Sequence, residues 1–184
     1  MKKAIYILIG MFIMTGFVSC SDEFLEPELQ QTKRYEEGLQ ETEDLHNLIK
    51  GIYNKMTAST YYGRDMIIYG EVRSDNTSNS ESTGRYVDVG RLDMVVNDEY
   101  AHDTWEIIYE SIAQANIAIQ SDVTDTTGQA TYYKGQAYGL RALCYFDLMR
   151  LYSTMFVSGA DYGVPIVTEY DPAAQITPPA RASL

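Results

Sequence analysis

Apolar residues in two segments of the chain recur every three or four positions, the spacing of one buried face on an α-helix. The pattern predicts amphipathic helices at about 43–57 and 102–121, with Thr42 and Asp103 as N-caps. Asn116 shares the apolar stripe of the second helix. We expect it to bond a neighbouring turn, because a buried amide without partners costs about 1–3 kcal/mol. The two stripes consist of Leu45, Leu48, Ile49, Ile52, Tyr53 and Met56, and of Trp105, Ile108, Tyr109, Ile112 and Ile119.

A third, longer helix is expected at about 127–153, and its pattern is apolar on two sides. Such a helix packs between neighbours. Four small residues are expected to allow close helix approach: Gly135, Ala137, Gly139 and Ala142. One apolar face contains Tyr133, Ala137, Leu140, Cys144, Leu148 and Leu151, and the other contains Ala142, Tyr145, Phe146, Met149 and Tyr152.

The remaining segments predict irregular structure. Residues 65–69 fit either a helical turn or a short strand, and the polar tract 74–84 has almost nothing to bury, which indicates a surface loop. Residues 163–167 are expected to be extended, and Pro172, Pro178 and Pro179 forbid a continuous helix after them. The sequence therefore predicts a mostly α fold with irregular loops.

The first twenty residues have the pattern of a bacterial lipoprotein signal. Met1-Lys2-Lys3 is followed by an uncharged run, 4–18, which is shorter than the roughly 20 residues of a membrane span. Ser19 then precedes Cys20, whose thiol would be lipidated. The pattern predicts a signal peptide at 1–19, a lipidated tether at 20–40 and a helical domain at 41–184. A buried apolar segment that ends in a chance cysteine is the alternative.

Composition and charge exclude some partners. Against 26 acidic residues stand 14 lysines and arginines, so the formal charge is −12, which argues against binding to nucleic acid or to anionic lipid. Two cysteines in 184 residues cannot form a disulfide framework. Tyrosine is abundant, with 16 copies, and suits both wet binding surfaces and half-buried helix faces.

The sequence contains no motif for catalysis. His46 and His102 lack partners at metal-binding spacing, and no HExxH, nucleophile elbow, phosphate loop or CxxC pattern occurs. The many acidic residues would supply a glycosidase-like carboxylate pair by chance. Asp/Asn clusters offer ligands for calcium, but without EF-hand spacing. We therefore expect no enzyme, no cofactor and no metal.

Sugar binding needs flat apolar faces together with planar polar groups. The loop-rich region 58–101 supplies these residue types, and we take eight positions there as candidate ligand contacts. The alternative is structural: Tyr62 would belong to the core, and Asp75 would cap a turn. Trp105, Tyr109, Arg141 and Tyr145 are interpreted as scaffold. The eight candidates are Tyr61, Tyr62, Arg64, Asp75, Asn76, Arg85, Tyr86 and Asn97.

Several blocks, in this order, resemble the SusD/RagB family of outer-membrane lipoproteins from Bacteroidetes. They are Ser19-Cys20-Ser21-Asp22-Glu23-Phe24-Leu25, Trp105-Glu106-Ile107-Ile108-Tyr109 with Ile112, Ala115, Asn116 and Ile117, the stretch Leu140-Arg141-Ala142-Leu143-Cys144-Tyr145-Phe146-Asp147-Leu148-Met149-Arg150-Leu151-Tyr152, Gly163-Val164-Pro165-Ile166-Val167-Thr168-Glu169, and Arg181-Ala182-Ser183. Family members are several hundred residues longer, so the chain resembles an N-terminal portion.

The resemblance implies tetratricopeptide-like helix pairs in a non-catalytic protein that is lipid-anchored in the outer membrane and exposed at the cell surface. Such proteins bind glycans and pass them to a SusC-like TonB-dependent transporter. RagB-like relatives take up peptides instead, which leaves a peptide-binding role open. A helical adaptor that binds only its membrane partner is a third hypothesis.

Overall fold

The computed structural model describes residues 38–154, 162–171 and 179–183. The signal peptide, Cys20 and nearly all of the tether therefore lie outside the described residues, as do Pro172 and Pro178. The elements described below belong to one compact unit, Leu39–Leu184.

The described part of the chain is mostly helical, as the sequence predicts. Its elements are α4 (Thr42–Met56), α5 (Asp65–Val72), the 3₁₀ turn η2 (Glu81–Thr83), α6 (Val87–Arg91), α7 (Glu99–Gln120) and α8 (Gln129–Tyr152). No strand occurs among the described residues, and a single antiparallel bridge joins Pro165 to Arg181.

Two predicted helix starts were wrong. The cap before α4 is Glu41 rather than Thr42, and the Glu41 backbone N–H donates to Asp44 Oδ2 at 3.0 Å. The cap of α7 is Asp98, not Asp103, and its Oδ1 accepts the N–H of Ala101 at 3.1 Å. The apolar stripe that predicted this helix begins at Trp105, whereas the first turn of α7 contains Tyr100, which packs against the separate cluster around Tyr86 and so lies outside that stripe.

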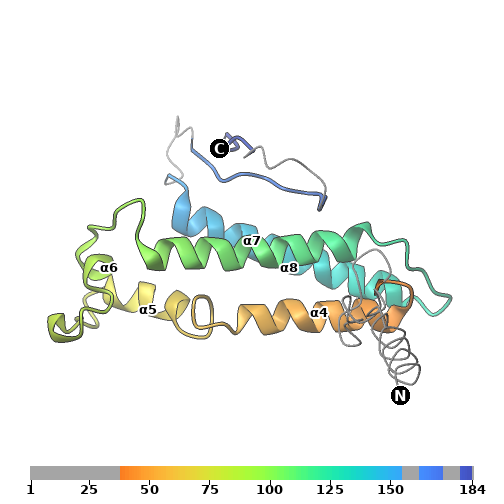
Figure 1. Ribbon diagram of the computed structural model, residues 1–184, viewed down its shortest axis with the longest axis horizontal. Helices are drawn as coiled ribbons and strands as arrows, with labels where there is room; N and C mark the ends of the chain where they lie inside the picture. Colours follow the sequence, from red (N-terminus) through yellow and green to blue (C-terminus); the bar gives the residue numbers. More distant parts are fainter. Residues whose placement is uncertain (1–37, 155–161, 172–178, 184) are drawn as a thin grey trace, which may run out of the picture. The chain divides into compact units, whose positions relative to one another are not determined.

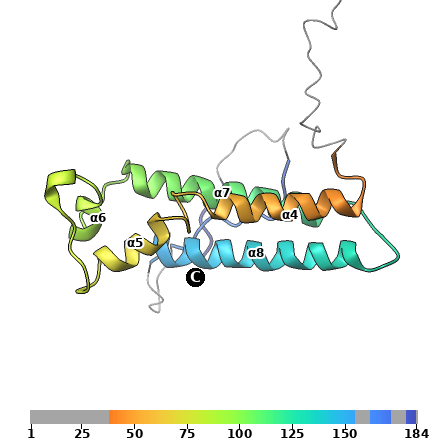
Figure 2. The same cartoon turned by 90° about the horizontal axis from the view of Figure 1, so that it is seen from below.

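Helices α4, α7 and α8 pack pairwise against one another and enclose the main core (Figures 1 and 2). The chain direction alternates, so that α7 runs antiparallel to both α4 and α8 (Figure 1). The fully buried side chains Leu45, Ile52, Ile108 and Leu148 come from all three helices. The predicted apolar stripes therefore face the core, except for Tyr53, which is 51% exposed.

The two-sided burial expected for α8 is only partly observed. The face with Ala137, Cys144 and Leu148 is buried. On the second face Phe146 remains 60% exposed, and Ala142 is exposed as well. Gly135 and Gly139 are also exposed, and a Cβ added at either position would meet nothing within 4 Å. The small residues thus do not create a close helix contact among the described residues, apart from Ala137.

The segment 163–168 packs across α7 and α8 through hydrogen bonds from helix side chains to its backbone. Asn116 Nδ2 donates to the carbonyl of Val167 at 3.0 Å, and Asn116 Oδ1 accepts from Arg141 at 2.7 Å. Tyr145 also bonds Val167, and Tyr109 donates to the carbonyl of Pro165 at 2.8 Å. The predicted structural role of Asn116 is therefore confirmed.

A tight turn connects α4 to α5 and requires glycine at its centre. A Cβ on Gly63 would lie 2.3 Å from the carbonyl oxygen of Thr57 and 2.7 Å from that of Ala58. No side chain fits at such distances without a backbone shift. The turn leads directly into α5, so the ambiguous segment at residues 65–69 is helical.

Asp147 of α8 holds this turn. Its carboxylate is 1% exposed, and its Oδ2 accepts the hydroxyls of Tyr61 and Tyr62, each at 2.7 Å. Arg150, three residues further along the same helix, donates to Oδ1 at 3.2 Å and forms an ion pair with it. A buried carboxylate is tolerated only when hydrogen bonds replace its water. The three donors meet that requirement and connect the turn to α8.

Asp65 anchors α6 to α5 in a similar way. This side chain is also 1% exposed, and it accepts Arg64 Nε at 2.5 Å and the hydroxyl of Tyr86 at 2.5 Å. Tyr86 has a left-handed backbone with φ of 55°, which a non-glycine residue rarely adopts. Stacking of its ring on Tyr100, with centroids 4.4 Å apart, helps to hold it there.

We predict that the folded unit loses stability above about pH 10. Burial, and then the bond to Asp147, raises the pKa of Tyr62 from 10.0 to about 12. Below pH 10 the hydroxyl is protonated in both states, so its contribution is complete. As the pH rises through 10 to 12, the unfolded chain loses this proton first, and the stabilisation is lost. Urea midpoints at pH 8 and 11 measure the change.

The control for the alkaline experiment is a pair of variants. Tyr62→Phe removes one of several buried phenols with a raised pKa, so it should make the pH dependence shallower without abolishing it. It should also lower stability at pH 8 by about 1 kcal/mol. Tyr132→Phe, at a side chain that is 65% exposed, should leave the curve unchanged. Equal midpoints at both pH values in the unaltered chain would contradict the assignment.

The unequal faces of α8 give a second prediction. Leu148→Ala should cost about 2–5 kcal/mol because it opens a cavity in the core. Phe146→Ser, two residues away on the exposed face, should change the free energy of unfolding by no more than about 0.5 kcal/mol. Chemical denaturation of both variants tests this, and similar losses at the two positions would mean that Phe146 is also packed.

Candidate functional site

The eight sequence candidates divide by their degree of burial. Tyr61 and Tyr86 are buried, at 0% and 8% exposure, and their hydroxyls are bonded to Asp147 and Asp65. Burial and the neighbouring carboxylates raise the pKa of both phenols well above the usual value. In this arrangement the two rings support the loops from inside and do not offer a face to solvent.

Tyr62 and Arg64 lie at the edge of these clusters. Tyr62 is half-buried, and its hydroxyl is already bonded to Asp147. The Arg64 side chain is 42% exposed, and its guanidinium carbon lies 5.9 Å from the ring centroid of Tyr86. The carboxylate of Asp65 raises the pKa of Arg64, which keeps the guanidinium charged.

The other four candidates, Asp75, Asn76, Arg85 and Asn97, are exposed. Asp75 and Asn76 follow the end of α5, where the hydroxyls of Ser74 and Thr77 each donate to the carbonyl of Glu71 at 2.8 Å. Arg85 immediately precedes Tyr86, and Asn97 precedes the cap of α7. The structure thus displays these four side chains on loops, and among the described residues no hydrogen bond joins them to one another.

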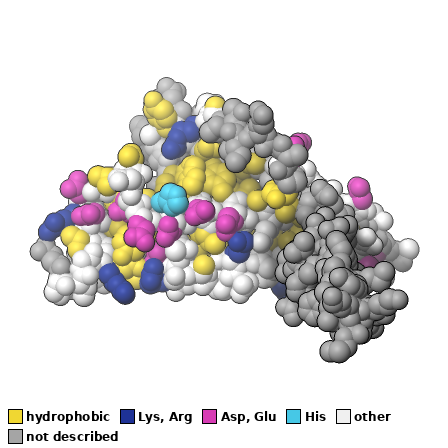
Figure 3. Space-filling model, in the orientation of Figure 1, with side chains coloured by type: hydrophobic (Ala, Val, Ile, Leu, Met, Phe, Trp, Pro, Cys, Tyr) yellow, Lys and Arg dark blue, Asp and Glu magenta, His cyan; other side chains and the backbone are white. Residues whose placement is uncertain are grey.

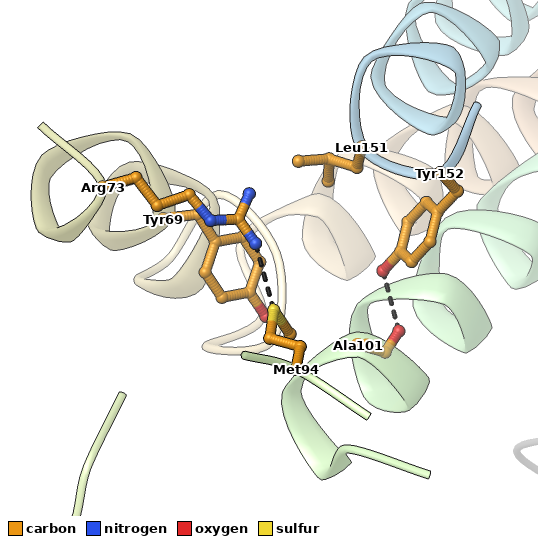
Figure 4. Close-up of a pocket in the computed structure, with 6 residues that line it drawn as sticks. All are labelled: Tyr69, Arg73, Met94, Ala101, Leu151 and Tyr152. Atoms are coloured by element: carbon orange, nitrogen blue, oxygen red, sulfur yellow. Dashed lines mark hydrogen bonds between the residues drawn. The ribbon is translucent and has the colours of Figure 1, made fainter. Parts of the chain in front are cut away.

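A groove that the sequence analysis missed lies between α5, the start of α7 and the end of α8 (Figure 4). One pocket in it has a volume of about 190 Å³, and an adjoining pocket that shares Tyr69, Arg73 and Leu151 has about 250 Å³. The walls are aromatic and aliphatic, and two guanidinium groups border them. The lining residues are Met66, Tyr69, Gly70, Arg73, Met94, Ala101, Arg150, Leu151 and Tyr152.

The tyrosines that line the groove are fixed by bonds to the backbone. The Tyr69 hydroxyl lies 2.9 Å from the Tyr100 carbonyl and 2.8 Å from Thr104 Oγ1, and Tyr152 donates to the carbonyl of Ala101 at 2.7 Å. Burial raises the pKa of Tyr69 to about 12 and raises that of Tyr152 as well. Both phenols therefore stay neutral at physiological pH and form rigid walls.

The two arginines of the groove are held differently. Arg150 is paired with the buried Asp147 and lies over the ring of Phe146, 5.7 Å from its centroid. Arg73 lies 5.6 Å from the ring centroid of Tyr69 and donates to the sulfur of Met94 at 3.1 Å (Figure 4).

The groove escaped sequence analysis because its residues come from four distant segments. One local signal is the spacing of Tyr69 and Arg73, four positions apart at the end of α5. That signal required α5 to be recognised as a helix, which the pattern at 65–69 left open.

Acidic side chains gather along one face of α7 (Figure 3). Among the described residues, His102, Asp103 and Glu106 bring one ligand atom each to within 4.8 Å of one another, so His102 does have carboxylate neighbours that its sequence spacing did not suggest. Asp103 Oδ1 already lies 3.2 Å from His102 Nδ1. Exposed acidic groups of this kind are common without an ion, and we assign no ligand to them.

The chain is similar to known proteins over most of its length. Residues 23–183 match the SusD-like family described as "Starch-binding associating with outer membrane". Two similar relatives are SusD-like proteins P38 and P2 of Formosa agariphila, each 27% identical, over 91% and 93% of this chain. The matches cover 31% and 34% of those proteins, so the chain spans about a third of their length. No solved structure matches significantly.

In the described part of the chain, no helix is both long and apolar enough to span a bilayer. The observed helical architecture is consistent with the family match, which covers every element from α4 to the segment after α8. The chain therefore belongs to the SusD-like family.

Proposed function

We propose that this chain is part of a cell-surface lipoprotein that binds glycans and passes them to a SusC-like TonB-dependent transporter of the outer membrane. Binding and transfer occur without catalysis. The observation that carries this proposal is the family match over residues 23–183, because the family is described as starch-binding and associated with the outer membrane.

The arrangement of the loops supports a binding role. Two buried carboxylates fix the connections on either side of α5, so the polar loops that follow lie on a rigid base. Exposed loops on a rigid scaffold are the usual place for ligand contacts. We propose that Arg64, Asp75, Asn76, Arg85 and Asn97 contact the glycan, with Tyr61, Tyr62 and Tyr86 supporting them from below.

The amino-terminal part of the chain is proposed to supply the anchor. After cleavage, Cys20 would be the lipidated residue, and the segment up to residue 40 would connect it to the helical unit. Two or more acyl chains make such an anchoring stable, since each buried CH₂ contributes about 0.8 kcal/mol.

Calorimetry of the full chain against a panel of polysaccharides and a peptide mixture tests the ligand class. A glycan should bind, and Asp75→Ala with Asn76→Ala should weaken it about tenfold, the effect of one or two lost hydrogen bonds. Asn47→Ala, at an exposed position on α4, is the control and should bind as the unaltered chain does. Binding of peptides alone would instead favour the RagB-like role, and co-purification with a barrel protein but no soluble ligand would favour the adaptor.

The anchor has its own test. Cells that express the full chain should incorporate labelled palmitate into it, and the chain should sediment with membranes. Cys20→Ala should abolish both, because the acceptor thiol is removed, while Cys144→Ala should retain the label because Cys144 is buried in the core. Continued labelling of the Cys20→Ala chain would exclude Cys20 as the lipidated residue.

A further inference from the structure

Arg73, which lines the groove beside α5, has no carboxylate partner among the described residues. No described carboxylate lies within 4.0 Å of the Arg73 guanidinium, whereas Arg64 and Arg150 are each paired with a buried aspartate. Asp65 and Asp98, which act electrostatically on the adjacent Tyr69, are engaged elsewhere, by Arg64 and Tyr86 and by the N–H of Ala101. The Arg73 side chain is exposed, so in a chain with a formal charge of −12 it places a local positive charge at the edge of the pocket.

The position of Arg73 at the end of α5 explains only part of why a positive charge lies at this point of the groove. A cation near a helix C-terminus is favoured by about 0.3–1 kcal/mol. That gain does not require the guanidinium to lie over Tyr69 and against Met94, which is where the groove holds it. Stacking and the sulfur contact preorganise the charged group and leave most of its five N–H donors available.

The other polar groups of the groove are already used. The hydroxyls of Tyr69 and Tyr152 are bonded within the protein, so the tyrosines offer only ring surface to a ligand. Leu151 and Met94 add apolar wall. The available donors are guanidinium N–H groups. They bind a carboxylate or a sulfate through two parallel charge-assisted hydrogen bonds, whereas a neutral hydroxyl oxygen brings no opposing charge and accepts only a weaker hydrogen bond from them.

We propose that this groove binds an acidic sugar residue, with its carboxylate or sulfate ester on Arg73 and its C–H face against the apolar wall. The pocket volume of about 190 Å³ is smaller than the roughly 300–1,000 Å³ of a site for a drug-sized ligand, so it suits one terminal or side-chain sugar. The inference rests on the proposed glycan-binding function and specifies the substrate class at a second contact region.

Binding of matched oligosaccharides to the full chain tests the proposal. A neutral hexose oligomer, the corresponding uronate oligomer and a sulfated oligomer are titrated at low salt and at about 0.5 M NaCl, where the Debye length is well below 10 Å. At least one acidic oligomer should bind more tightly than the neutral one, and its affinity should fall with salt because the contact is ionic. The uronate and sulfated arms distinguish the two anionic groups.

Arg73→Gln should weaken the acidic oligomer about tenfold or more and leave any binding of the neutral one unchanged, since only the ionic contact is removed. Arg73→Lys should rescue only part of the loss, because a point charge replaces a planar fork. Lys50→Gln removes a charge from the exposed surface of α4 and should have no effect. Far-UV circular dichroism confirms that each variant retains its helices.

The remaining outcomes separate this proposal from the function on which it rests. Equal binding of neutral and acidic oligomers, unaffected by Arg73→Gln, would overturn the acidic-sugar site and leave glycan binding intact. Failure of all three oligomers and of the polysaccharide panel would overturn both. Arg73-dependent binding of an acidic peptide, without binding of any acidic oligomer, would overturn the saccharide assignment in favour of a peptide.

Discussion

The burial of the Asp147 carboxylate constrains the connection between the helical core and the loops. A charge in the interior is tolerated only if donors replace its water, and Tyr61, Tyr62 and Arg150 supply them. Two of the donors come from the turn after α4 and one from α8 itself. The requirement to satisfy the carboxylate therefore fixes the turn against α8, and with it the point at which α5 begins.

Asp65, the first residue of α5, extends the same principle outward. Its bonds to Arg64 and Tyr86 hold α6 in place, including the left-handed backbone of Tyr86. The strain of that conformation, of the order of 1–2 kcal/mol, is offset by the charged hydrogen bond and by stacking on Tyr100. A ligand-binding surface on the following loops would thus be supported by polar contacts, whereas the three long helices are supported by apolar packing. The same division accounts for some of the tyrosines. Tyr61, Tyr86 and Tyr152 each place a ring in an apolar environment and a hydroxyl on a carboxylate or a backbone carbonyl.

The fold class and the three long helices were predictable because their information is local. Apolar spacing specifies a helix and the face it buries, and Leu45, Ile108 and Leu148 are all buried as expected. The pattern of 65–69 was ambiguous. Apolar residues lie on all sides of α5, so the spacing of apolar positions did not identify it as a helix. The start of α7 at Asp98 was missed because its first turn lies outside the apolar stripe that predicted the helix.

The candidate site was less predictable because residue type does not reveal burial. Tyr61 and Asp75 both suit a sugar, yet one lies in the core and the other is exposed. The groove around Arg73 required residues from α5, α7, α8 and the loop with Met94 to come together. The sequence by itself determined the three long helices and the family, since both depend on local patterns. Tertiary structure alone decided which guanidinium of the described groove has no carboxylate beside it, because ion pairing depends on residues that are distant in the chain.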